Sequence, residues 1–165
     1  MSDNIIDKFN ITLDEFICKM INQLSEEPKI KTYYSAFKVA KMFKKNLPLE
    51  LYMGGCINFV EQIKTRDSEF FLQRKQFVNA CVECSSFSND IGLLNHWGTL
   101  SDKTKSAIWD YIQTLFVMGE MYMKKNENSL EKIKNVYNNF SHDEIKRFDN
   151  NSNNQFSDDF LNKLK

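Results

Sequence analysis

Apolar residues recur every three or four positions along most of the chain, the spacing that places them on one face of an α-helix. Thr12 and Glu15 have the T-x-x-E form of a capping box at a helix N-terminus. A helix is therefore predicted to begin at Thr12 and to end before Pro28, which cannot continue it. The residues that share its apolar face are Leu13, Phe16, Ile17, Met20, Ile21 and Leu24.

A second helix is predicted over about residues 30–46, and Pro48 either ends it or opens a third as its first helical residue. Gly54 and Gly55 lie inside this third helix and cost about 2 kcal/mol of helix propensity relative to alanine. Such a pair indicates close helix packing, a kink or a break. The second helix has an inner stripe of Tyr33, Phe37, Ala40 and Phe43, and the third carries Leu51, Tyr52, Cys56, Val60 and Ile63.

The strongest helical pattern of the chain follows Ser101, which is a preferred N-cap residue. Met118 and Met121 lie off the apolar face of this helix, so a second buried surface is expected there, within the core or at a dimer interface. The sequence therefore leaves open whether the chain forms a homo-oligomer. The main face consists of Ile108, Trp109, Ile112, Leu115, Phe116, Gly119, Tyr122 and Met123. A further amphipathic helix carries Leu130, Ile133, Val136, Tyr137 and Phe140.

No stretch shows the period-two alternation of a strand, which makes the predicted fold class all-α. A length of 165 residues suits one domain, and 14 phenylalanines can fill its core. We expect one globular domain of about six to eight amphipathic helices over residues 1–148. Residues 149–156 read as a polar, Asn-rich linker. Residues 157–165 then form a short C-terminal helix or tail.

The charges balance, with 22 basic and 22 acidic side chains. This balance argues against a protein that coats nucleic acid by bulk charge, but it allows a local patch. Residues 28–49 contain six lysines and no acid. Four of these lysines share one arc of a helical wheel, which is either a solvated helix face or a weak, sequence-independent nucleic-acid site. They are Lys31, Lys38, Lys41 and Lys45.

No sequence motif of nucleotide binding or hydrolysis occurs: the phosphate-binding glycine loops, the serine-hydrolase elbow and the zinc-protease helix are all absent from the sequence. We therefore predict no catalytic residue and no cofactor.

The N-terminus lacks the basic and apolar regions of a signal peptide. The longest apolar runs are far shorter than the ~20 residues that span a bilayer. The expectation is a chain that is not secreted and has no membrane partner.

Metal binding has one candidate. Cys81 and Cys84 form a C-x-x-C pair, and His96 and Cys56 could complete a four-ligand zinc site. A second closely spaced ligand pair, which would strengthen this interpretation, is missing. The alternative is that both thiols are small buried apolar groups three positions apart on a helix. We favour free thiols in a reducing compartment.

The residues from 66 to 116 form a recognisable pattern. Residues 66–71 read RDSEFF, residues 95–101 read NHWGTLS, and residues 103–115 read KTKSAIWDYIQTL. This pattern resembles an uncharacterised family of helical proteins from the nucleocytoplasmic large DNA viruses, which include the giant and algal viruses. The shared residues are mostly of core and helix-cap types, so the resemblance implies a common fold and assigns no catalytic residue.

The absence of every catalytic motif, together with the resemblance, leads us to expect a non-enzymatic protein of a large DNA virus that acts through protein–protein interaction, as an accessory or virion protein. Its partner would be a viral or host protein, and its location the host cytoplasm or the virion. A nucleic-acid-binding accessory factor and a small zinc-binding domain remain as alternatives. A third is a Bcl-like apoptosis regulator, because residues 95–98 are similar to the Asn-Trp-Gly-Arg motif of that family. Here a histidine is inserted, and Thr99 stands where the arginine belongs.

Overall fold

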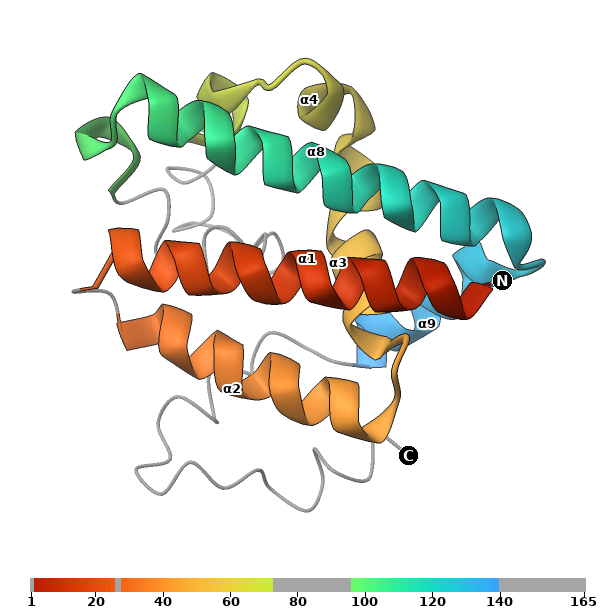
Figure 1. Cartoon of the computed structure of the whole chain (residues 1–165). Coiled ribbons are helices and arrows are strands. Elements are labelled where there is room, and N and C mark those ends of the chain that lie inside the picture. The colour runs from red at the N-terminus through yellow and green to blue at the C-terminus, as the bar shows by residue number, and fades with distance from the viewer. Residues whose placement is uncertain (1, 26–27, 73–95, 140–165) are drawn as a thin grey trace.

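The computed structural model describes residues 2–25, 28–72 and 96–139, and within these ranges every regular element is a helix. The prediction of an all-α fold is thereby confirmed (Figure 1). The helices are α1 (Ser2–Gln23), α2 (Pro28–Phe43), α3 (Leu47–Cys56), α4 (Val60–Lys64), α8 (Asp102–Lys125) and α9 (Ser129–Asn139). Two 3₁₀ turns, Ile57–Phe59 and Trp97–Thr99, accompany them.

Three helices lie side by side in one layer, with α1 between α2 and α8 (Figure 1). The chain direction of α1 is opposite to that of both neighbours. Behind this layer, α3 runs from the C-terminal end of α2 past α1 to α8, and it packs against α9. The α1–α8 seam includes a stack of Phe16 on Tyr111, with ring centroids 5.1 Å apart, and Lys19 donates a hydrogen bond to the Tyr111 hydroxyl.

One apolar core joins these elements. Each helix of the layer contributes side chains to it, and α3 and α9 close it from behind. Burying one such side chain stabilises the fold by about 1.5–3 kcal/mol. The most completely buried apolar members are Phe9, Ile30, Leu49, Met53, Leu115 and Ile133.

The first helix differs from its prediction, because α1 begins at Ser2 and passes through Thr12 without a break. The reason is that the apolar face extends toward the N-terminus through Ile5, Ile6 and Phe9, which are all buried. Core packing of these three residues outweighs the local capping signal, so the expected start at Thr12 is wrong. The helix ends at Gln23, and Pro28 is the first residue of α2, a position that suits proline.

The predicted third helix is divided. Pro48 lies in the first turn of α3, as expected, and α3 ends at Cys56, directly after the glycine pair. A 3₁₀ turn then leads into α4. A close contact occurs at another glycine: a Cβ added to Gly119 of α8 would overlap the Met53 side chain of α3. The absence of a side chain at Gly119 leaves room for the Met53 side chain between α8 and α3.

The start of α8 agrees with its prediction. Ser101 is the N-cap, and its Oγ accepts a hydrogen bond of 3.2 Å from the Thr104 backbone N–H. Met118 packs against the core, whereas Met121 is exposed. The predicted linker 149–156 and the tail 157–165 lie outside the described residues.

Candidate protein-binding surface

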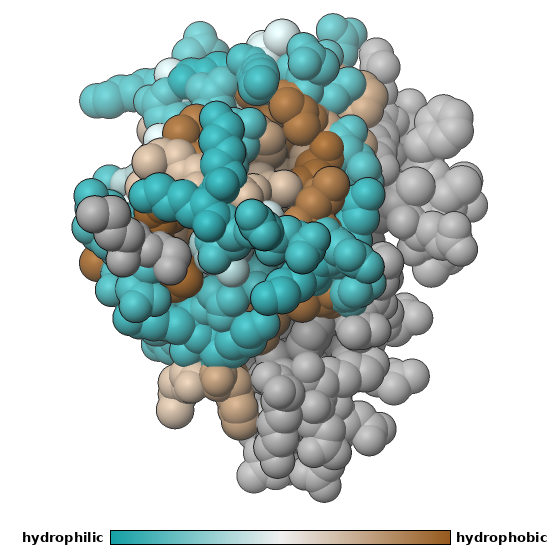
Figure 2. Space-filling model, turned by 90° about the vertical axis from the view of Figure 1, so that its right-hand side faces the viewer, coloured by the Kyte–Doolittle hydropathy of each residue, from teal (hydrophilic) through white to brown (hydrophobic). Residues whose placement is uncertain are grey.

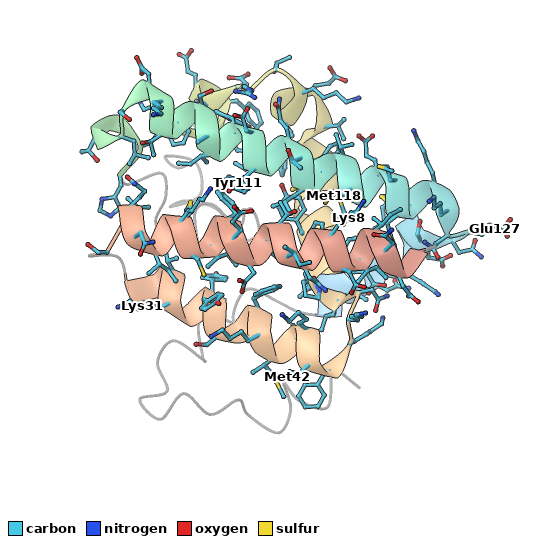
Figure 3. The ribbon with its side chains drawn as sticks, in the orientation of Figure 1. Lys8, Lys31, Met42, Tyr111, Met118 and Glu127 are labelled. Carbon is cyan, nitrogen blue, oxygen red and sulfur yellow. The ribbon has the colours of Figure 1, made fainter. Side chains whose placement is uncertain are left out.

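The outer side of α2 combines lysines with exposed apolar side chains. The opposite side of the helix buries Ile30, Phe37 and Ala40. Lys31, Lys38 and Lys41 are all exposed. In Figure 3, Lys31 lies at one end of α2 and Met42 at the other, where the Met42 side chain projects away from α1.

The last two residues of α2 are apolar and largely uncovered. The Met42 side chain is 83% exposed and Phe43 is 45% exposed. Figure 2 shows hydrophobic side chains that protrude at the lower edge of the molecule, the edge at which α2 lies in Figure 1. We call Lys31, Lys38, Lys41, Met42 and Phe43 together the α2 surface.

The exposure of Phe43 corrects an expectation, because the sequence pattern placed this residue on the inner stripe of its helix. The buried side of α2 ends one turn earlier, at Ala40, which packs with Leu47 of α3. The chain turns at residues 44–46, directly after the helix ends. Phe43 therefore extends past the last point at which α2 contacts the bundle. Leu130, also expected on an apolar face, is likewise exposed at the start of α9.

Two lysines of the α2 surface lie over aromatic rings of the same helix. The Lys38 ammonium is 4.1 Å from the centroid of the Tyr34 ring, and the Lys41 ammonium is 5.4 Å from that of Phe37. Such contacts contribute about 0.5–1 kcal/mol at exposed sites. They hold positive charge close to the helix, beside the apolar Met42–Phe43 tip, without neutralising it.

Lys44 and Lys45, which follow α2, are ion-paired. Lys45 follows the end of α2, and its Nζ lies 2.7 Å from Asp7 Oδ1 of α1. The hydrogen bond to Asp7 raises the pKa of Lys45. Lys44 Nζ lies 3.2 Å from Glu50 Oε2. Of the four lysines that the helical wheel grouped, the structure thus places Lys31, Lys38 and Lys41 on α2 and brings Lys45 to α1.

A buried acidic residue lies below this turn. Glu50 of α3 is only 1% exposed, and Asn46 Nδ2 donates a 2.7 Å hydrogen bond to its Oε1. The Tyr122 hydroxyl of α8 lies 3.4 Å from the same oxygen, and Asn46 also donates to the Tyr122 hydroxyl. We call Lys44, Asn46, Glu50 and Tyr122 the Glu50 cluster. Its hydrogen bonds join the α2–α3 turn to the C-terminal half of α8.

Residues of the segment 66–116 meet in a second polar group. Arg66 has a left-handed backbone conformation with φ 53°. Its guanidinium donates to Gln113 Oε1 at 3.0 Å and to Ser106 Oγ at 3.3 Å, and it forms an ion pair with Asp110. Gln113 in turn donates to the carbonyl of Ile63. We call Arg66, Ser106, Asp110 and Gln113 the Arg66 clamp, because it fastens the end of α4 onto α8.

Aromatic residues of the same pattern pack beneath this clamp. Trp109 lies 6.0 Å from Phe71 and 6.5 Å from Trp97, measured between ring centroids. The Trp109 indole N–H donates a hydrogen bond of 2.9 Å to Ser68 Oγ. The Thr99 hydroxyl, at the position compared with the Bcl-like arginine, donates to the His96 carbonyl. The pattern residues described here thus form core and fastening contacts.

The predicted zinc ligands are only partly within the described residues. Cys81 and Cys84 lie outside them, His96 immediately precedes a 3₁₀ turn, and Cys56 ends α3. Burial raises the pKa of the Cys56 thiol to about 12, which opposes the thiolate form that zinc binds. Within residues 2–25, 28–72 and 96–139, no group of three or more His, Cys, Asp or Glu side chains could hold a metal ion.

Sequence reasoning missed both the Met42–Phe43 tip and the Glu50 cluster. A signal for the Glu50 cluster was present, since Glu50 interrupts the apolar run LPLELYM, where a charge indicates a buried and partnered carboxylate.

Among the described helices, none is both long enough and apolar enough to cross a bilayer. Comparison with protein-family models, with curated proteins and with solved structures finds no match for this chain.

Proposed function

We propose that this chain is a non-enzymatic protein-binding module and that the α2 surface is its binding site. The observation that carries the proposal is the Met42–Phe43 tip, which is exposed beside Lys38 and Lys41. Apolar side chains that protrude next to charged ones are typical of protein contact sites. The two polar groups of the bundle, by contrast, consist of hydrogen-bonded side chains that connect helices.

The α2 surface defines the chemistry of its partner. Met42 and Phe43 require an apolar side chain to cover them, and three ammonium groups favour carboxylates at the rim. An acidic, amphipathic peptide segment of a protein partner combines both properties. Helical segments of this kind bind through a few apolar anchors, with charges that set orientation and association rate.

The viral assignment is part of the same proposal. Supporting it are the RDSEFF, NHWGTLS and AIWDYIQTL segments, of which the described residues pack together around Trp109. A shared packing unit of this kind fits a common fold. We propose that the chain is an accessory or virion protein of a large DNA virus, with a viral or host protein as partner.

Affinity capture with matched variants tests the proposed surface. Tagged wild-type chain is captured from the cells that produce it, in parallel with Met42→Ser/Phe43→Ser and with Ile11→Ser. Ile11 is a suitable control because it is 68% exposed on α1. We expect a protein partner that survives nuclease, binds the Ile11 variant normally and is lost from the double variant. A partner retained equally by all three chains would exclude the α2 surface as its site.

A nucleic-acid-binding function is the second candidate, favoured by the three exposed lysines on one helix. The affinity-capture experiment distinguishes this function from protein binding, because nucleic acid that co-purifies with the chain would disappear after nuclease treatment. Lysines that contact phosphates release counterions, so binding would also weaken steeply with salt. Replacing Lys31, Lys38 and Lys41 with glutamate would abolish such binding, whereas Met42→Ser/Phe43→Ser would leave it nearly unchanged.

A further inference from the structure

The described part of the chain ends near the C-terminal end of α2, on the buried side of that helix. In α9, Val136 packs against the small apolar cluster formed by Ala40 of α2 and Leu47 of α3. Ala40 lies only two positions before Met42 on the same helix. The described end of α9 thus lies near the end of α2 that carries the exposed apolar tip, and the tip itself is on the opposite side of α2.

The sequence that follows contains the chemistry expected of a partner. Asp158 and Asp159 stand next to Phe160 and Leu161, and Phe156 precedes them. No lysine or arginine occurs from residue 148 to residue 162. The stretch from residue 28 to residue 49 has the opposite composition, with six lysines and no acid. Acid beside apolar residues in one segment complements lysine beside apolar residues in the other.

The intervening chain is long enough to make the connection. Sixteen residues, 140–155, separate the end of α9 from Phe156, and an extended stretch of that length spans up to about 54 Å. The helix α2 has 16 residues and is therefore about 24 Å long. Every part of the α2 surface is within reach of residues 156–161.

We propose that residues 156–161 of this chain bind the α2 surface of the same molecule. Phe160 and Leu161 cover Met42 and Phe43, and the carboxylates of Asp158 and Asp159 pair with Lys38 and Lys41. A tethered segment has an effective concentration in the millimolar range, so it competes with partners in solution. The inference rests on the proposed function, and it adds regulation: a partner must displace the chain's own tail.

Zero-length carbodiimide cross-linking of the full chain tests this contact, because the reagent joins only carboxylates and amines that already touch. Lys45 and Asp7, 2.7 Å apart, provide an internal positive control. We expect Asp158 or Asp159 to become linked to Lys38 or Lys41, and an equal mixture of ¹⁴N- and ¹⁵N-labelled chains to show links within single chains. Links that occur only between chains would overturn the proposal, as would equal linkage to the exposed Lys64 and Lys124.

A binding measurement distinguishes failure of this inference from failure of the proposed function. The probe is a fluorescent peptide with the sequence of residues 154–165, titrated into the full chain and into the full-length variant Asp158→Asn/Asp159→Asn/Phe160→Ser. We expect the variant to bind at least tenfold more tightly, because its own tail no longer competes. If the peptide bound both chains equally and a Met42 substitution abolished that binding, the tail contact would be overturned. The α2 surface would still stand as a binding site. No binding to either chain would overturn both.

Discussion

The two polar groups of the bundle use similar side chains in different surroundings. Both the Glu50 cluster and the Arg66 clamp fasten a turn onto α8, and both combine an ion pair with side-chain amides or hydroxyls. Glu50 is 1% exposed, whereas the Arg66 and Asp110 side chains of the clamp are 37% and 64% exposed. Water can replace a lost partner in the clamp but cannot reach the Glu50 carboxylate.

This difference teaches that burial, more than the number of hydrogen bonds, decides what each group contributes to stability. A buried polar atom left without a partner loses its full solvation, while an exposed one returns to water. The α2 surface is the third case. Lys38 and Lys41 contact ring faces of their own helix, and Met42 and Phe43 are exposed, so substitutions there should change the stability of the fold little.

The largest effect is expected from Glu50→Ala. Removal of the carboxylate leaves Asn46 and the Tyr122 hydroxyl without their acceptor in a buried site, and the free energy of unfolding falls by about 2–3 kcal/mol. Glu50→Gln keeps an acceptor oxygen and costs less. Urea denaturation, followed by the fluorescence of the two tryptophans, measures both. A loss below that of Arg66→Ala would contradict the comparison.

Gly119→Ala tests how tightly α8 and α3 are held together one turn before Tyr122. The new Cβ would overlap the Met53 side chain, which is itself buried. Overpacking of this kind costs about 1–3 kcal/mol. Gly98→Ala is the matched control, because a Cβ at Gly98 has no atom within 4 Å among the described residues. Equal stability of the two variants would show that the Met53 side chain moves aside at little cost.

Arg66→Ala should lower the free energy of unfolding by about 1 kcal/mol, since the clamp is half exposed and its charges are screened. Arg66→Gly removes the same side chain but tolerates the positive φ of this position. The glycine variant should therefore be the more stable of the two by a few tenths of a kcal/mol. An alanine variant as stable as wild type would show that the clamp contributes nothing.

The smallest expected effect is a difference in how the free energy of unfolding depends on pH above pH 10. Burial raises the pKa of Tyr122 above its ordinary value of 10.0, so the folded chain retains this proton more strongly than the unfolded chain. The contribution of the protonated Tyr122 hydroxyl to the free energy of unfolding is fully present below pH 10. It is lost as the pH rises through the pKa that this hydroxyl has in the folded chain. Tyr122→Phe should flatten the fall of stability with alkaline pH, whereas Arg66→Ala should leave the slope unchanged.

Helical periodicity predicted the elements that are long and strongly patterned. The fold class and the Ser101 cap of α8 are local properties, and the structure agrees with both. Of the three alternatives that Gly54–Gly55 left open, the structure has the break. The start of α1 is also encoded locally, by Ile5, Ile6 and Phe9, but it competes with a capping signal at Thr12. Packing settles that competition, because three buried apolar side chains contribute more than one capping box.

The candidate site shows which features could not be predicted from residue type and local spacing. By itself, the sequence determined which residues of α2 are cationic and that a helix forms there, because both follow from residue type and spacing. Only the tertiary structure decided that Lys45 turns to Asp7, that Glu50 meets Tyr122 from 72 positions away, and that Phe43 stays uncovered. These outcomes depend on where α2 ends relative to α1 and α3, and that position is set by the packing of the whole core.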